Sequence, residues 1–204
     1  MPDRIADDQF SLQVESPVHA QALADYIRDT GDWLDVVPGI ASVVVRFDAS
    51  RVDGADASRV LASINNDFSF VAPTDGPVIE IPVSYGGDDG PDLADVCAAV
   101  GISTADFVEL HTSPEYPVEM VGFTPGFAFI GGLQEELRVP RRSEPRQSVP
   151  SGSVAIADSR TGLYAMSSPG GWNIVGRTSA PLFDPHRDEP FLVSPGMRVR
   201  FTAS

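Results

Sequence analysis

His111 and Arg177 are the titratable residues whose type and position are best suited to catalysis in this sequence. Histidine exchanges protons near neutral pH, and His111 lies near the end of an expected helix, before a glycine- and phenylalanine-rich loop. Arginine can hold a carboxylate or a phosphate through two parallel hydrogen bonds, and Arg177 lies near the end of the segment SSPGGWNIVGRT. Each also has a structural alternative, a histidine bonded to a helix-terminal carbonyl or an arginine in an ion pair. Both alternatives stay open.

A binding site is predicted in residues 121–178, which combine glycine, proline and aromatic residues. Glycine lets the backbone approach a ligand closely, and large apolar side chains beside it can line a pocket. The alternative is a set of tight turns above a core. Tyr116, which follows His111 closely, could share its pocket or pack at an interface. The candidate substrate-binding residues are Tyr116, Phe123, Phe127, Ser168, Gly170, Gly171, Trp172 and Asn173.

Arg141, Arg142 and Arg146 form the one basic cluster of a strongly acidic chain. Prolines around them favour an extended segment, which could dock an acidic partner or a phosphate. A solvated loop is the alternative. Cys97 falls on an apolar helical face and is expected to be a buried structural thiol.

The composition excludes several kinds of chemistry. The formal net charge is −15, and all 14 basic residues are arginine. Without lysine there is no Schiff-base, P-loop or biotin-carrying lysine, and the acidic surface argues against nucleic acid and anionic membranes. One cysteine and three separated histidines predict no metal site. No apolar run reaches the roughly 18 residues of a membrane span, so a cytoplasmic protein is expected.

The first part of the chain is predicted to be a ferredoxin-like βαββαβ domain over residues 1–75. Period-two alternation indicates strands, and Ser16 followed by Pro17 is typical of a helix start. Helical spacing places Tyr26 on the buried face of the first helix and Val60 on that of the second. The expected elements are strands at 10–14, 33–37, 42–47 and 68–71, with helices from 17 and over 56–65.

The second part, residues 76–204, is predicted to be a β-barrel domain that follows a linker at 73–77. A strand at 78–83 precedes two helices, the first ended by Gly101 and the second begun by a capping box from Ser103 to Asp106. From Tyr116 onward, short strands alternate with glycine and proline, as in all-β barrels. The fold class is therefore α+β.

Several motifs stand in a fixed order in the second part of the chain: GFTPGFAFIGGL, PRRSEPR, PSGSVAIADSRTGLY, SSPGGWNIVGRT, LFDP and PGMRVRF. They resemble, in the same order, the B subunit of bacterial 5-oxoprolinase, a family also known for sporulation-kinase inhibitors and labelled allophanate hydrolase subunit 1. The resemblance covers about residues 78–201 and implies a cyclophilin-like barrel. Two departures are Phe129, where similar proteins tend to have tyrosine, and Ala157–Arg160, in place of an Ala-Gly-x-Gln run.

The resemblance implies a subunit of an ATP-dependent enzyme that opens 5-oxo-L-proline to L-glutamate. Such subunits work with a larger homologous C subunit and a separate A subunit. In that picture Arg177 would hold the substrate carboxylate and His111 would move a proton. ATP with Mg²⁺ would act in the complex, where a partner subunit could bind it, and this chain would carry no cofactor of its own.

Two alternatives also follow from relatives: an inhibitor of a sporulation-type histidine kinase, and the carboxyltransferase half-module of a biotin-dependent urea carboxylase. Each would give the chain a different partner. The apolar loop 123–133 would be a costly exposed patch on a monomer, which favours one half of a heteromer.

Overall fold

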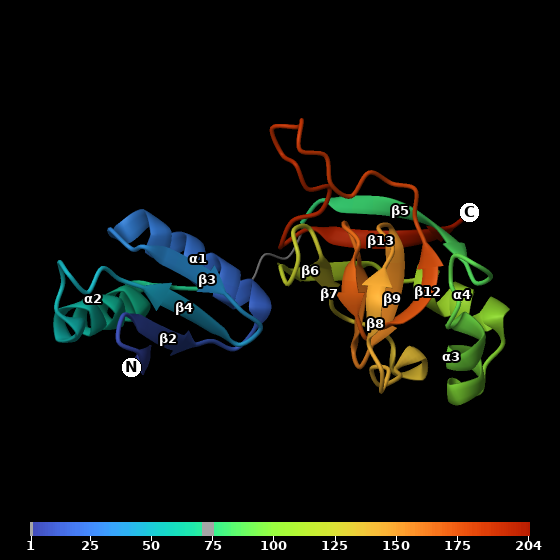
Figure 1. Ribbon diagram of the computed structural model, residues 1–204, viewed down its shortest axis with the longest axis horizontal. Coiled ribbons are helices and arrows are strands. Elements are labelled where there is room, and N and C mark those ends of the chain that lie inside the picture. Colours follow the sequence, from blue (N-terminus) through green and yellow to red (C-terminus); the bar gives the residue numbers. More distant parts are fainter. Residues whose placement is uncertain (1, 71–75) are drawn as a thin grey trace. The chain divides into compact units, whose positions relative to one another are not determined.

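The computed structural model describes residues 2–70 and 76–204 (Figure 1). The chain divides into two compact parts, Met1–Thr74 and Asp75–Ser204, which we call unit 1 and unit 2. The boundary expected at residue 75, and most of the linker expected at 73–77, fall outside the described residues. None of the helices in the described ranges has the length and apolar character that a membrane crossing requires.

Unit 1 is a four-stranded antiparallel sheet with two helices. The sheet has the order β1-β2-β4-β3, and the buried faces of both helices join it in one core. Its elements are β1 (Asp3–Ala6), β2 (Gln9–Gln13), α1 (Pro17–Thr30), β3 (Asp35–Pro38), β4 (Ser42–Arg46) and α2 (Gly54–Asp67).

Local sequence signals set both helix starts in unit 1. Ser16 caps α1 by accepting a hydrogen bond from the His19 amide, and Pro17 occupies the first turn as expected. Asp53 caps α2 through the Ala55 amide at 2.8 Å. These caps satisfy amide groups that have no partner inside the helix.

Three expectations for unit 1 are wrong. Residues 68–70 form no strand. In a βαββαβ domain the last strand would pair with β2 at the edge of the sheet. Here β1 occupies that edge. Val71, the last residue of that expected strand, lies outside the described residues. Tyr26 and Val60 are 37% and 47% exposed, because Ala24 and Ala57 bring the backbone of their helices close to the sheet instead.

Unit 2 is a closed barrel with the strand order β10-β7-β6-β13-β5-β12-β9, which confirms the expected all-β architecture. Its likeness to a cyclophilin stays a prediction. A separate two-stranded ribbon joins β11 to β8. The elements are β5 (Val78–Tyr85), α3 (Leu93–Val100), α4 (Thr104–Thr112), β6 (Tyr116–Val121), β7 (Ala128–Ile130), the 3-10 helix η1 (Glu135–Leu137), β8 (Arg146–Val149), β9 (Ser153–Ala157), β10 (Arg160–Leu163), β11 (Ser168–Gly170), β12 (Asn173–Arg177) and β13 (Arg198–Ala203).

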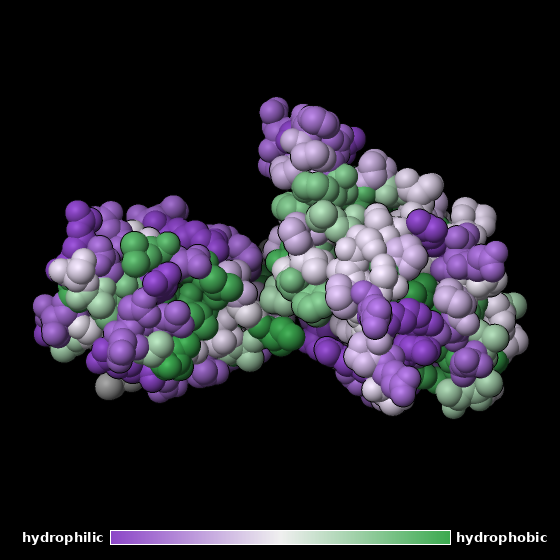
Figure 2. Space-filling view, viewed as in Figure 1, coloured by the Kyte–Doolittle hydropathy of each residue, from purple (hydrophilic) through white to green (hydrophobic). Residues whose placement is uncertain are grey.

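The last strand completes the barrel. β13 lies between β5, to which it pairs in parallel from Val78 to Val83, and β6, to which it pairs antiparallel. Strands far apart in the sequence therefore share one wall. The segment between β12 and β13 projects from the barrel (Figure 1), and its tip is hydrophilic (Figure 2).

The two helices of unit 2 follow the sequence signals closely. Gly101 ends α3 with φ of 77°, a left-handed conformation that glycine adopts without strain. Ser103 and Asp106 form the expected capping box at the start of α4. Cys97 is buried on α3, and burial raises the pKa of its thiol, in accord with the expected structural thiol.

Candidate functional site

Four of the sequence motifs meet at one small cavity of unit 2, which we call the aromatic pocket. Its volume is about 90 Å³. Because segments spread over about fifty residues converge here, the pocket is a product of the barrel fold rather than of one loop. Phe123, Phe127 and Phe129 come from the first motif, Arg141 from the second, Tyr164 from the third, and Gly170, Gly171 and Trp172 from the fourth.

Phe127 is the centre of the aromatic pocket. Its ring meets Phe129 and Tyr164 edge to face at 4.7 Å, Trp172 at 5.5 Å and Phe123 at 5.9 Å. Edge-to-face pairs contribute about 0.5–1.5 kcal/mol each beyond area burial, so this cluster is rigid. Phe127 is 2% exposed, whereas Phe123 is 69% exposed and forms the outer wall.

The backbone around the pocket needs its glycines. Gly126 has φ of 75°, and a side chain there would press on Ala165 and Phe191. A side chain at Gly170 would collide with the Tyr164 hydroxyl. Phe123 has φ of 74°, a conformation that costs a residue with a large side chain about 1–3 kcal/mol. A strained, exposed phenylalanine is therefore held at the pocket mouth.

Arg141 places a positive charge at the rim of this pocket. Its guanidinium carbon lies 5.8 Å from the centre of the Trp172 ring, and Nε lies 3.8 Å from a carboxylate oxygen of Asp158. Both side chains of that ion pair are mostly exposed, so the attraction is weak and a ligand can compete for it. A small flat group could lie against Trp172 and Phe129 with an anionic substituent toward Arg141.

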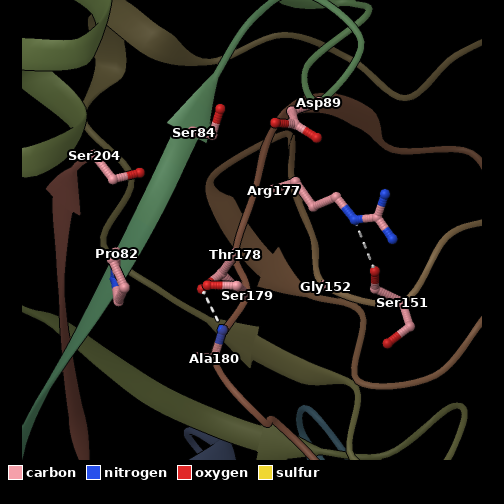
Figure 3. Close-up of a pocket in the computed structure, with 10 residues that line it drawn as sticks. All are labelled: Pro82, Ser84, Asp89, Ser151, Gly152, Arg177, Thr178, Ser179, Ala180 and Ser204. Carbon is pink, nitrogen blue, oxygen red and sulfur yellow. Dashed lines mark hydrogen bonds between the residues drawn. The ribbon is translucent and has the colours of Figure 1, made fainter.

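Arg177 opens into a different cavity of about 530 Å³, which we call the Arg177 pocket (Figure 3). Its Nε donates to the Ser151 carbonyl at 3.2 Å. Asp89 and several hydroxyl groups share this pocket, and none of the described residues lines both cavities. The structure thus separates Arg177 from the aromatic candidates.

His111 is enclosed in the barrel. Its Nδ1 lies 2.7 Å from the Tyr85 hydroxyl and its Nε2 3.1 Å from Thr161 Oγ1. Thr161 itself donates to the Ala155 carbonyl at 3.3 Å, so its oxygen is free to accept a hydrogen bond from Nε2 while Tyr85 donates one to Nδ1. Both nitrogens of a neutral imidazole are satisfied.

Burial lowers the pKa of His111 to about 3, because the charged form would lose its hydration. The ring stacks on Phe201 with centroids 4.6 Å apart. Tyr116 lies beside it, as expected, but donates to the His111 carbonyl at 3.1 Å and is also buried. His111 lines neither pocket, and its two nitrogens bond hydroxyl groups rather than the helix-terminal carbonyl of the structural alternative. Both residues belong to the buried interior of the barrel.

Ser168 and Asn173 are likewise outside both pockets. Ser168 is buried and donates to the Pro169 carbonyl at 3.3 Å, and Asn173 donates to the Pro140 carbonyl at 2.9 Å. The Asn173 side chain thus joins two segments, whereas the Ser168 bond is local. Of the candidate site residues, the structure brings together Phe123, Phe127, Gly170, Gly171 and Trp172.

The three arginines of the cluster have two different sets of partners: Arg141 lies at the aromatic pocket, and the other two bind Asp92. Arg142 binds Asp92 at 2.9 Å and Arg146 binds it at 2.7 Å, while the Ile174 amide donates to the same carboxylate at 2.7 Å. Asp92 is 4% exposed, so these are partly buried structural contacts. The expectations of a docking patch and of a solvated loop are both wrong for Arg142 and Arg146, because Asp92 engages them.

The apolar loop 123–133 is mostly interior, contrary to the exposed patch expected of a monomer. Phe127, Ile130 and Leu133 are buried, and Phe123 is the exposed aromatic side chain. Sequence reasoning named Arg141 only as part of the basic cluster, and it missed Tyr164 and Asp92. Tyr164 lies inside a quoted motif, so motif membership was the available signal; Asp92 had none.

Comparison with known proteins agrees with the motif resemblance. Residues 5–193 match the family described as carboxyltransferase domain, subdomain C and D. The 5-oxoprolinase B subunit of Escherichia coli O157:H7 is 42% identical over 203 residues, which cover 97% of this chain and 93% of that protein. The 5-oxoprolinase B subunit of Bacillus subtilis strain 168 is 36% identical and covers 95% and 85%.

Solved structures show the same fold. A crystal structure of TTHA0988 superposes with a TM-score of 0.80 at 36% identity, and this chain spans 96% of its own length but only 40% of that chain. The Kluyveromyces lactis urea carboxylase shares the fold, with a TM-score of 0.80 at 16% identity over 21% of that chain. The chain therefore belongs to the carboxyltransferase subdomain C and D family, and within it to the family of 5-oxoprolinase B subunits.

Proposed function

We propose that this chain is the B subunit of an ATP-dependent 5-oxoprolinase, which opens 5-oxo-L-proline to L-glutamate together with a homologous C subunit and an A subunit. The observation that carries the proposal is similarity to such B subunits over nearly the whole chain, combined with the convergence of four motifs on the aromatic pocket. Substrate contact is assigned to this pocket, because His111 is enclosed and Arg177 opens elsewhere.

The pocket suits a small ring better than a nucleotide. Its volume of about 90 Å³ is far below the roughly 300–1,000 Å³ typical of pockets for drug-sized ligands. Arg141, the one cation among its described lining residues, is also a poor match for a triphosphate with Mg²⁺. The residues around it therefore do not fit ATP, and the proposal places the nucleotide outside the aromatic pocket.

A shared site follows from the pocket's shape and chemistry. Phe123 stands at the mouth with one side exposed, and the pocket alone cannot enclose a substrate. A lactam resists hydrolysis, and its opening requires activation in a site from which water is excluded. In the proposal this chain supplies the aromatic wall and the Arg141 charge for the substrate carboxylate, and the C subunit covers the open side.

The test is 5-oxoproline-dependent ATP hydrolysis by the complex assembled from all three kinds of subunit. Phe123→Ala and Arg141→Gln change exposed side chains, so the barrel should stay folded. Each should lower kcat/KM at least about tenfold, the loss expected when a charge-assisted or stacking contact to the substrate is removed. Arg187→Gln, on the projecting loop and paired with Asp184 at 3.7 Å, is the matched control.

Two results would contradict the proposal. An assembled complex without 5-oxoproline-dependent hydrolysis would reject the activity. Full activity of Phe123→Ala and Arg141→Gln would reject the aromatic pocket as the place of substrate contact.

A second candidate is the carboxyltransferase half-module of a biotin-dependent urea carboxylase. It is favoured by the family match and by the shared fold with the Kluyveromyces lactis urea carboxylase. Transfer of a carboxyl group from a biotin carrier to urea, measured with the same assembled complex, separates this candidate from the first. The kinase-inhibitor alternative has no specific structural support and stays a prediction.

A further inference from the structure

The Arg177 pocket is built on rigid elements. Arg177 ends β12, where its backbone pairs with Ser84 of β5 on one side and Ser153 of β9 on the other. Its side chain leaves the barrel wall and is oriented by the bond from Nε to the Ser151 carbonyl. A guanidinium held in this way loses little further freedom when it binds a ligand.

Arg177 differs from every other arginine of unit 2. Within the described residues, all the others make a salt bridge with an aspartate or glutamate. Acidic residues outnumber basic ones by 29 to 14, so a partner for Arg177 would be easy to provide. Arg177 instead lines the cavity, and its two terminal nitrogens make no hydrogen bond or salt bridge within the described residues, while Nε donates to Ser151 (Figure 3).

Asp89 brings a negative charge to the same pocket. The loop after β5 folds back on β12, because the Gly86 amide donates to the Val175 carbonyl at 3.1 Å and the Gly90 amide donates to the Gly86 carbonyl at 2.8 Å. Gly90 must be glycine, since a side chain would collide with the Val175 carbonyl. This close approach sets Asp89 above the Arg177 side chain, yet no salt bridge joins the two among the described residues (Figure 3).

Polar groups fill the space around the two charges. Ser84 and Ser179 line the cavity, and their hydroxyls make no side-chain hydrogen bond within the part of the chain that the structure describes. An unpaired cation and an unpaired anion in one polar cavity suit a ligand that carries both complementary charges.

We propose that the Arg177 pocket binds a free α-amino acid, with its carboxylate on Arg177 and its ammonium group on Asp89. A simple anion would leave Asp89 unpaired and facing it, which is unfavourable. 5-Oxo-L-proline, a lactam, has a carboxylate but no ammonium group, so the pocket is expected to favour the open amino acid over its closed ring. The cavity alone carries the inference, and the proposed function supplies only the choice of probes.

The test is calorimetric titration of the full-length chain, without partner proteins, with three probes. These are L-glutamate, 5-oxo-L-proline, which has the same carbon skeleton without the ammonium group, and inorganic phosphate. Saturable binding of L-glutamate is expected, with 5-oxo-L-proline and phosphate at least about tenfold weaker, as for the loss of one charged hydrogen bond.

Two variants test which charged residue binds which group of the ligand. Arg177→Gln should weaken L-glutamate binding at least about tenfold, and Asp89→Asn should weaken it similarly while leaving 5-oxo-L-proline unchanged or tighter. Arg187→Gln is the control for net charge, and circular dichroism checks that each variant is folded. The assay needs no catalysis, so its outcome is independent of the activity test.

Three results would overturn the inference. They are no L-glutamate binding on the order of 10 mM, a weak-affinity limit near −3 kcal/mol; phosphate or 5-oxo-L-proline binding as tightly as L-glutamate; and unchanged L-glutamate affinity in a folded Asp89→Asn. Tight phosphate binding lost in Arg177→Gln would identify a plain anion site instead.

Discussion

At the residue scale, His111 shows how burial reverses the expected chemistry of a side chain. The imidazole is held between Tyr85 and Thr161, with a pKa lowered to about 3. Burial therefore keeps the His111 side chain uncharged throughout the physiological range. Its hydrogen bonds instead connect α4 to two strands of the barrel.

The first prediction concerns stability at acidic pH. The unfolded chain binds a proton at His111 near pH 6.5 and the folded chain only near pH 3, so the unfolded state binds more protons between these values. Stability should therefore fall as the pH is lowered from about 6.5, with a limiting slope of about 1.4 kcal/mol per pH unit for one proton. Urea unfolding between pH 7 and about 5, where carboxylates titrate little, measures the slope.

The control for this prediction is His111→Gln, which can hydrogen-bond but cannot titrate. It should show a flatter dependence over the same range. An equal slope in both proteins would mean that His111 does not cause it. A neutral-pH dependence of catalytic rate that disappears in the variant would restore the proton-transfer role.

At the element scale, Asp92 connects three segments that are distant in the sequence. It precedes α3, accepts hydrogen bonds from Arg142 and from Arg146 of β8, and accepts another from the Ile174 amide of β12. The carboxylate is nearly inaccessible to solvent, so all of its lone pairs depend on these donors. The extended arginine segment is thereby fixed beside the aromatic pocket.

The second prediction follows from this network. Asp92→Asn removes the charge while keeping the side-chain volume, and should lower the free energy of unfolding by at least about 2 kcal/mol, since hydrogen bonds to charged groups contribute about 1.5–3 kcal/mol each. Asp158→Asn is the control, because its pair with Arg141 is exposed and should contribute at most about 1 kcal/mol. Similar losses in the two variants, measured by urea unfolding, would contradict the role of Asp92.

Local signals predicted elements well where one residue decides the outcome. Ser16, Gly101 and the Ser103–Asp106 capping box act within a single turn, so their effect is visible in the sequence. The strand Asp3–Ala6 was missed because pairing with β2 sustains it, while its own side chains are exposed and show no apolar alternation. Tertiary pairing cannot be read from such a segment.

The candidate site was predictable only in part, because local features are visible in the sequence and long-range contacts are not. Glycine and aromatic content located the aromatic pocket, since Phe127, Trp172 and their glycines act through shape. Which charged residues line the pocket depends on contacts with residues that are distant in the sequence. Arg141 and Arg142 are adjacent, yet one faces Trp172 and the other Asp92.

At the scale of the whole molecule, each unit has its own hydrophobic core. Leu23 and Leu61 belong to the core of unit 1, while Phe107 and Phe201 belong to that of unit 2. No residue belongs to both core clusters within the described ranges. Each unit thus has the separate core that a cooperatively unfolding domain needs, and each is expected to unfold in its own step.

The third prediction is therefore two transitions in calorimetry. Leu23→Ala, a fully buried leucine in unit 1, should lose about 2–5 kcal/mol and lower only one transition temperature. Leu137→Ala, a fully buried leucine in unit 2, should lower only the other. A single transition that shifts as a whole in both variants would contradict independent units.

The place of β13 in the barrel also orders the events of synthesis. Residues 198–203 pair with residues 78–83, so the wall between β5 and β6 stays open until the last strand has left the ribosome. Until then two strand edges lack a partner, and unpaired edges recruit other chains into aggregates. Contacts of such large sequence separation also slow folding. The barrel thus passes through a period, set by the speed of translation, in which solubility depends on chaperones rather than on its own sequence.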